Sequence, residues 1–371
     1  MQLDFHYYAT YCAAYLAGYN HQECLDIAYS AQFVDCLSKT FLKRIKATPL
    51  AATTQLQLEM MDLKKDAFGV QEITRIWSSF HFLPYDLYSQ SRGGKLYKAK
   101  YRLICNTNGD LLVKTVDLAK NNTLQTVGIA MHVLADTWAH RYFAGTPSFV
   151  INNTTSHFYE IIKDENGEFK RRLINFRNSA TKPDDIENGI YTCSLYQSDE
   201  YATMNLGHGR AGHLPDYSFM RYAYLPAWGN YEEIIKDNPS DYLHAFTQMI
   251  YAMKYLRGLN GENFEKEHYD FEAIEPYKER IINILEKRQL DASEDWKAFG
   301  EELSKKEIPP FSVETYVNAY LDANEENKKD TFLGKFITGA INHKQMVVSN
   351  IIESKNPFVG LSIRRKKRRD K

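Results

Sequence analysis

One stretch of the sequence carries three ionisable side chains at a spacing that could do chemistry. His132, Asp136 and His140 follow one another at intervals of four residues, so on a helix they share one face of about 80°. Their neighbours are apolar on nearly every other side, which predicts a buried helix from Leu124 to about Phe143. An unpaired carboxylate is costly to bury, and imidazole and carboxylate are natural ligands of Zn²⁺.

The length of this row bears on the number of metal ions. His132 and His140 would lie about 12 Å apart along the helix axis, too far for one ion to bind both through bonds of about 2 Å. The row therefore suits two or more ions, with Asp136 as a bridge between them. The alternative is a polar seam satisfied by tyrosine hydroxyls and Arg141.

Further residues of the metal-ligating type occur outside this helix. Asp4 and His6 open the first predicted helix, where Asp4 could instead be the N-cap. Asp35 lies in an apolar stretch and His81 among aromatic residues, and each alone could be an ordinary surface or core residue. A glycine-rich stretch adds four candidates, either at a site or in a solvent-facing loop, namely His208, Arg210, His213 and Asp216.

The elements that would position these residues are mostly helices. Helices are expected over 5–17, 20 to about 45, 51–63, 70–79, 124–143, 242–256 and much of the chain after 265. Asn-Gly pairs at 108–109 and 166–167 predict β-hairpins near 100–117 and 155–178. The expected fold class is mostly α, a helical bundle with small β-hairpin insertions and a C-terminal helical extension. We expect a metal-binding domain over 1–260 and a helical region over 261–371 that ends in a basic tail.

The net charge of the 371 residues is −1, but it is unevenly distributed. Residues 361–371 include the run Arg364 to Arg369, and the rest of the chain is mildly acidic. The tail could bind an anionic partner such as nucleic acid or a membrane surface, or be a solvated terminus. The acidic body argues against a protein that clamps DNA with its whole surface.

Several other classes of protein are excluded by composition. Five cysteines without CxxC spacing argue against a disulfide framework and a cysteine zinc site. No transmembrane segment and no cationic leader are evident, which predicts a cytoplasmic protein. P-loop, G-x-S-x-G and His-Asp signatures are absent from the sequence.

The order of the candidate ligands resembles the zinc-dependent phospholipase C and single-strand-specific zinc nuclease superfamily. The resemblance is carried by His6, Asp35, His81, His132-x-x-x-Asp136, His140, and His213 with Asp216. Over about residues 1–260 the chain also resembles an uncharacterised family of bacterial proteins with DFHYYATY, HVLADTWAHRYF and GHGRAGHLPD blocks. The superfamily resemblance implies a helical bundle around a trinuclear zinc cluster.

The resemblance also implies which residues would hold each ion. Asp35, His81, His132 and Asp136 would bind one zinc; Asp136 would bridge to a second, held with His6; and His140, His213 and Asp216 would hold the third, with His208 as a substitute. Enzymes of the superfamily usually add the amine of a processed N-terminus. That ligand is expected to be absent here, because Met1-Gln2 opens the sequence with no leader, and Asp4 is expected to replace it.

A cluster of two or three zinc ions, or other divalent ions, predicts a metal-dependent hydrolase and above all a phosphodiesterase. Its substrate would be a small phosphodiester, a lipid headgroup or nucleic acid. Asp35 or Asp136 could accept a proton from water, and Arg141 or Arg210 could stabilise charge on phosphoryl oxygens. Two alternatives stay open: a non-catalytic interaction protein with a structural metal and a nucleic-acid-binding tail, and a metallohydrolase of a non-phosphate ester or amide.

Overall fold

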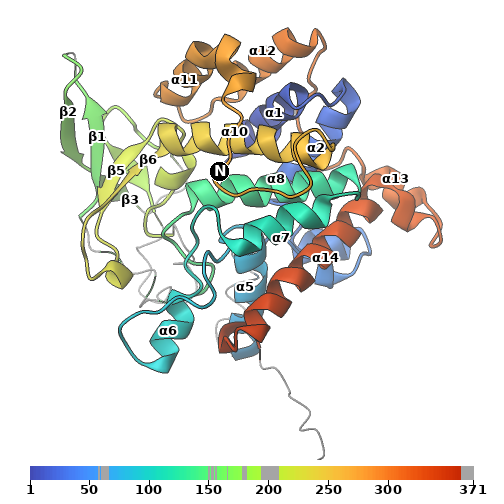
Figure 1. Ribbon diagram of the computed structural model, residues 1–371, viewed down its shortest axis with the longest axis horizontal. Helices are drawn as coiled ribbons and strands as arrows, with labels where there is room; N and C mark the ends of the chain where they lie inside the picture. Colours follow the sequence, from blue (N-terminus) through green and yellow to red (C-terminus); the bar gives the residue numbers. More distant parts are fainter. Residues whose placement is uncertain are drawn as a thin grey trace, which may run out of the picture.

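The computed structural model describes the whole chain except residues 57–58, 60–66, 149–150, 152–153, 155–156, 165, 178–181, 194–208 and 361–371. The described part is mostly α, as predicted, with a small sheet on one side (Figure 1). The longer helices are α1 (Thr10–Leu16), α2 (His21–Phe33), α3 (Lys39–Arg44), α5 (Ala67–Phe80), α6 (Lys95–Tyr101), α7 (Asp110–Ala119), α8 (Leu124–Ala139), α10 (Asn238–Leu256), α11 (Lys278–Glu286), α12 (Ser293–Ser304), α13 (Val317–Asp322) and α14 (Phe332–Glu353). A π-helix, η1 (Asp4–Ala9), precedes α1, and short 3-10 turns are η2 (Pro49–Ala51), η4 (Leu214–Asp216), η5 (Ala227–Gly229), η6 (Glu272–Tyr277), η7 (Lys328–Asp330) and η8 (Pro357–Val359).

Helix α8 lies at the centre of the fold. It is buried from Gln125 to its end, and it packs against α2, α5, α7, α10 and α14. Figure 1 shows α8 crossing the middle of the molecule between α10 and α7. Thr123 caps its first turn by accepting from the N–H of Thr126. The predicted buried helix is therefore confirmed, although it ends at Ala139 and leaves His140 at the C-cap.

The contact between α8 and α2 depends on a glycine. A Cβ added at Gly128 would meet Ile27 O at 2.4 Å and the Ser30 Cβ at 2.5 Å, so the two helices would have to separate. We expect Gly128→Ala to lower the free energy of unfolding by about 1–3 kcal/mol through overpacking. Urea denaturation measures this. Gly229→Ala is the control, because its Cβ would meet only the Pro226 Cγ at 3.5 Å; equal effects of the two substitutions would contradict the argument.

The sheet consists of β1 (Tyr159–Lys163), β2 (Phe169–Leu173), β5 (Arg221–Tyr224) and β6 (Ile234–Asp237), in the order β2-β1-β5-β6. All its neighbouring strands are antiparallel, and Tyr159 pairs with both Leu173 and Ala223. The predicted hairpin near 155–178 is thus confirmed as β1–β2, with Gly167 at positive φ in its turn. Two further strands, β3 (Asn175–Arg177) and β4 (Ile190–Thr192), form a separate parallel pair.

The hairpin predicted near 100–117 is wrong, because this segment forms α6 and α7. Asn108 does adopt positive φ, but Gly109 then serves as the N-cap of α7 instead of turning the chain into a strand. The Asn108 side chain accepts from Gln248 Nε2 (2.6 Å) and donates to the Tyr269 hydroxyl (3.1 Å). Tertiary hydrogen bonds therefore decide the conformation here.

Two helix predictions in the first 63 residues also change. The second helix begins at its capping box as predicted, with Asn20 and Glu23 bonded reciprocally, but it ends at Phe33 and α3 follows with Ser38 as its cap. Of the helix expected over 51–63, most lies outside the described residues. The described residues 51–56 contain only the end of the turn η2.

The C-terminal helices pack on the same core as the N-terminal ones. Helix α12 contacts η1 and α1, and α14 contacts α5 and α8. One hydrophobic cluster includes buried side chains from Met1 to Val359. The division at residue 260 stays a prediction. No helix in the described ranges is long and apolar enough to cross a membrane.

Candidate metal centre

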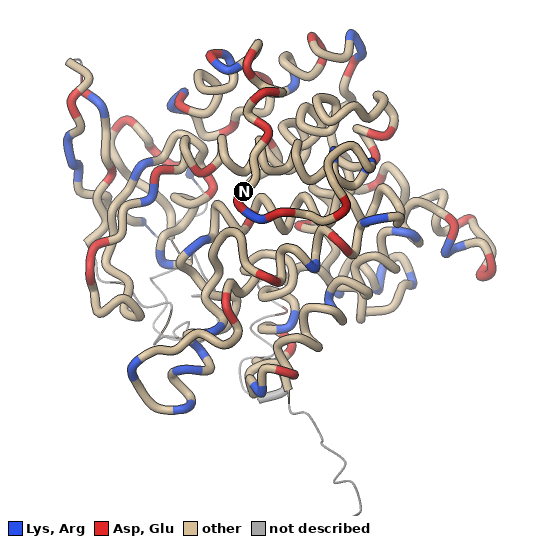
Figure 2. The backbone as a smooth tube through the Cα atoms, viewed as in Figure 1, with Lys and Arg blue, Asp and Glu red and all other residues tan. Residues whose placement is uncertain are grey.

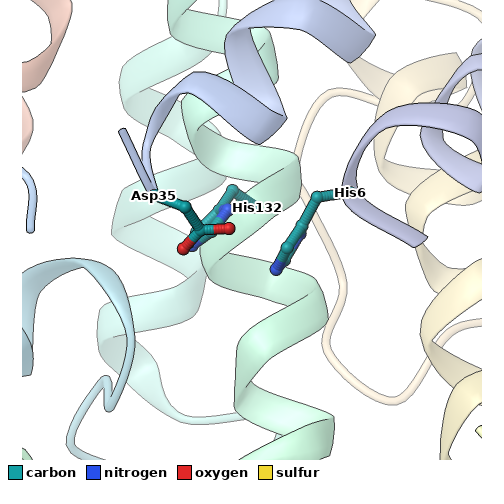
Figure 3. A group of neighbouring side chains, drawn as sticks. All are labelled: His6, Asp35 and His132. Carbon is teal, nitrogen blue, oxygen red and sulfur yellow. The ribbon is translucent and has the colours of Figure 1, made fainter. Parts of the chain in front are cut away.

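Candidate ligands from separate parts of the chain meet beside the C-terminal half of α8. His6 comes from η1, Asp35 from the turn after α2, and His81 from the turn after α5, while His132 and Asp136 lie on α8 itself. Figure 3 shows His6, Asp35 and His132 turned toward one another from three elements. A π-helix such as η1 is rare and is often found at functional sites.

Three atoms that could bind a metal ion through their lone pairs form a nearly regular triangle. Asp136 Oδ2 is 3.2 Å from both His81 Nδ1 and His132 Nε2, and these two nitrogens are 3.3 Å apart. Ligands of a tetrahedral zinc ion, at bond lengths of about 2.0–2.1 Å, lie about 3.3–3.4 Å from one another. Asp35 Oδ1 approaches the same nitrogens at 3.7 and 3.9 Å. The triangle therefore has the dimensions of a ligand set.

Backbone carbonyls fix which nitrogen of each histidine faces the centre. Because a carbonyl can only accept, His132 Nδ1 donates to Ala31 O (2.9 Å) and His81 Nε2 donates to Thr53 O (3.1 Å). In a neutral ring the opposite nitrogen then carries a lone pair, which points toward the carboxylate of Asp136. Acceptors that face one another across 3.2 Å need a proton or a metal ion between them. Burial opposes protonation of His81, but Asp136 and Asp35 outweigh it and raise its pKa.

His6 has no hydrogen-bond partner for either ring nitrogen among the described residues, although its side chain is fully buried. Its Nε2 lies 3.2 Å from Asp136 Oδ1, but the hydrogen-bond geometry fails there. The ring stacks on His132 with centroids 3.9 Å apart. A buried polar atom without a partner is costly, so this imidazole fits a ligand role better than a structural one.

A second group of donors surrounds the other oxygen of Asp136. The α-amino group of Met1 lies 3.0 Å from Asp136 Oδ1, 3.1 Å from Asp216 Oδ1 and 3.5 Å from His140 Nε2. His140 Nε2 is itself 3.2 Å from Asp216 Oδ1, and its Nδ1 donates to His81 O (2.8 Å). The expectation that no amine reaches the site is therefore wrong for this structure. Asp136 is shared by both groups.

Burial and charge shift the pKa values across the cluster. Burial lowers the pKa of His6 and of His132 to about 4, so both rings are neutral and able to bind metal. Burial opposes ionisation of Asp136, but His140 and the amine outweigh it and hold its pKa well below the usual value. For the Met1 amine burial is likewise outweighed, by Asp136 and Asp216, and its pKa rises to about 11. Burial raises the pKa of Asp35.

Residues outside the cluster hold two of its parts in place. Asp216 ends the turn η4, whose carbonyls accept from Asn238 Nδ2 (2.8 Å, to Leu214 O) and the Tyr242 hydroxyl (3.1 Å, to Pro215 O). At the end of α8, the buried Lys236 Nζ donates to Trp138 O (2.8 Å) and pairs with Asp241. Sequence analysis missed Lys236, although Asp241 lies only five residues further along, because the contact with Trp138 O joins segments 98 residues apart.

A cavity of about 790 Å³ opens over the cluster. Asp35, His81, Asp136, His140 and Asp216 contribute to its wall, whereas the deeper His6 and His132 do not. The lining also includes Gln32, Trp77, Lys182, Asp184 and Tyr217, which sequence analysis did not single out. A metal centre at this position would be open to a ligand of substrate size on one side.

Some predicted site residues lie elsewhere. The Asp4 carboxylate accepts from Phe5 N (2.8 Å) and Ala292 N (3.2 Å), and its pKa rises to about 6 through burial, so it ties η1 to α12 and does not replace the amine. Arg141 pairs with Asp241 (3.2 Å), and Arg210 donates to Thr154 O (3.3 Å). Neither arginine lines the cavity, so the role expected for them on phosphoryl oxygens is not supported.

The glycine-rich stretch is only partly described. His213 lines the cavity with its side chain half exposed, and its Nδ1 lies 3.5 Å from Asp216 Oδ2. Asp216 raises the pKa of His213. His208 lies outside the described residues, as does the basic tail over 361–371.

Comparison with known proteins gives a family without a function. The profile of the family of unknown function DUF6765 matches residues 1–351, and the chain belongs to this family. No curated protein and no solved structure matches the chain.

Proposed function

We propose that this protein is a metal-dependent hydrolase, with two zinc or similar divalent ions held on either side of Asp136. The observation that carries the proposal is the triangle of Asp136, His81 and His132. Its three acceptor atoms face one another at 3.2–3.3 Å in a buried setting, which calls for a cation. One ion would take Asp35, His81, His132 and Asp136, with His6 adjoining, and the other Asp136, His140, Asp216 and the Met1 amine in its neutral form.

We further propose that the reaction is hydrolysis of a phosphodiester. When bound, the ions would supply a Lewis acid for phosphoryl oxygens and the acidity that activates water. Asp35 is the carboxylate that we assign as proton acceptor, because it lines the cavity and its side chain is 31% exposed. Lys182, an exposed cation that lines the same cavity, could attract an anionic substrate.

The decisive experiment is metal analysis of protein purified without chelators, by inductively coupled plasma mass spectrometry. We expect about two equivalents of transition metal per chain, as the two donor groups imply. The same preparation should hydrolyse bis(p-nitrophenyl) phosphate and lose that activity after dialysis against a chelator. Less than one equivalent of metal would overturn the metal centre. Two equivalents without cleavage of the phosphodiester would retain the metal centre and reject this reaction.

A further inference from the structure

A feature of the surface that the proposed reaction does not use lies in residues 85–102, which we call the basic lobe. It comprises the loop after His81 and the helix α6. Its cations are Arg92, Lys95, Lys98, Lys100 and Arg102, against a single carboxylate, that of Asp86. Figure 2 shows several of the Lys and Arg segments grouped on this projection around α6.

The positive charge of the basic lobe is not neutralised locally. Arg92, Lys95, Lys98 and Lys100 form no salt bridge with any carboxylate that the structure describes. Arg92 and Lys95 are exposed, and Lys100 stands 5.7 Å above the ring of Phe358. The lobe thus presents a cationic surface to solvent.

Large apolar side chains project from the same lobe. Tyr88 and Leu96 are each 65% exposed, and Tyr85 is 46% exposed. The ring of Trp228 lies against Tyr101 at the edge of the lobe. Exposed Leu and Tyr beside Lys and Arg are typical of surfaces that sit at the boundary between lipid headgroups and acyl chains.

The last described residues of the chain lie beside this lobe. Asn356 Nδ2 donates to Ala99 O (2.6 Å), which joins η8 to α6, and Gly360 is the last described residue. The sequence that follows holds seven Lys or Arg and one Asp. Residues 1–360 as a whole are acidic, so the cations of the basic lobe stand out from the rest of the described chain.

We propose that the basic lobe binds an anionic lipid surface. Two signals, a cationic patch and inserted apolar side chains, are what stable peripheral binding requires. Leu96 favours lipid over nucleic acid, because an aliphatic side chain gains nothing from a phosphate backbone but partitions into the interface. The acidic remainder of the body also disfavours a long polyanion that would run across it. The proposal does not depend on the metal centre.

Sedimentation with vesicles tests the proposal on the full-length chain as purified. We expect binding to phosphatidylcholine vesicles that contain about 30% phosphatidylglycerol, little binding to pure phosphatidylcholine, and weaker binding at about 0.5 M salt. Lys95→Glu with Lys98→Glu, and Tyr88→Ser with Leu96→Ser, should each weaken the binding by about tenfold or more.

Matched controls carry the same changes on other faces. Phe169→Ser with Leu173→Ser alters two side chains of β2 that are 57% and 50% exposed, and Lys305→Glu with Lys306→Glu alters two exposed lysines after α12. Both should bind anionic vesicles like the unmodified chain. The proposal is overturned if the vesicles do not sediment the protein, if the lobe variants bind as well as the controls, or if single-stranded RNA binds where vesicles do not.

Discussion

Asp136→Asn is expected to abolish metal loading and activity together. The carboxylate is shared by both donor groups, with Oδ2 facing His81 and His132 and Oδ1 facing His6 and the Met1 amine. An amide has the same shape but no charge, and its NH2 group donates hydrogen bonds and cannot bind a cation, so the side chain cannot bridge two cations. Metal content should fall from about two equivalents to below one. Phosphodiester cleavage should fall by roughly a thousandfold or more, because several kcal/mol of charge stabilisation is lost.

The control for this substitution is Asp26→Asn on α2. Asp26 is half-buried and accepts from Gln22 Nε2 (2.9 Å) and the Tyr316 hydroxyl (3.3 Å). Neither partner is a candidate metal ligand. It should keep its metal content and activity. Circular dichroism would establish that both variants are folded. An Asp136→Asn protein that still holds two equivalents of metal would show that the carboxylate is not the bridge.

Glu160→Ala is expected to produce the largest loss of stability. Glu160 lies on β1 with its side chain fully buried, and it pairs with Arg172 (2.5 Å) and Arg288 (2.7 Å). Both arginines also donate to Ile186 O, in the segment between Pro183 and Thr192 that borders the cavity. Removal of the carboxylate leaves two guanidinium groups without their counter-ion, and because each arginine side chain is about a third exposed, we expect a cost of about 2–4 kcal/mol. Urea denaturation measures the change in the free energy of unfolding.

The adjacent residue of β2, Arg171, supplies a matched control. Arg171 and Glu233 form a bidentate pair at 2.6 and 2.7 Å, but both side chains are at least a third exposed. Glu233→Ala should therefore cost about 0–1 kcal/mol despite its good geometry. If the two substitutions cost the same, burial is not what makes the Glu160 cluster important.

Local sequence patterns predicted those parts of the fold whose causes are local. The all-round apolar character of residues 124–139 predicts α8, Asn20 with Glu23 predicts the start of α2, and Asn166-Gly167 predicts the β1–β2 turn. Asn108-Gly109 predicted a hairpin that does not form, because the conformation of this pair depends on hydrogen bonds to Gln248 and Tyr269, which lie far away in the chain. A dipeptide with two compatible conformations takes the one that distant contacts favour.

The candidate site, too, could be predicted from the sequence only in part. Residue types and spacing single out the imidazoles and carboxylates that converge on Asp136. They do not reveal the carbonyls of Ala31, Thr53 and His81 that set the ring orientations, because carbonyl direction follows from packing. Asp4 and Arg141 have suitable side chains but lie outside the site. Their partners, Ala292 N and Asp241, are a hundred or more residues away in the chain, so the sequence around each does not reveal the contact.

Since a single carboxylate serves both donor groups, the two halves of the site are not thermodynamically independent. A cation on the Oδ2 side withdraws charge from the Oδ1 side and also fixes the rotamer in which that oxygen is presented. Thermodynamic linkage requires that the factor by which the first ion changes the affinity for the second equals the factor by which the second changes the affinity for the first. Because the first cation draws charge away from the shared carboxylate, it would weaken the binding of the second ion, so the two ions would be acquired in two separate steps.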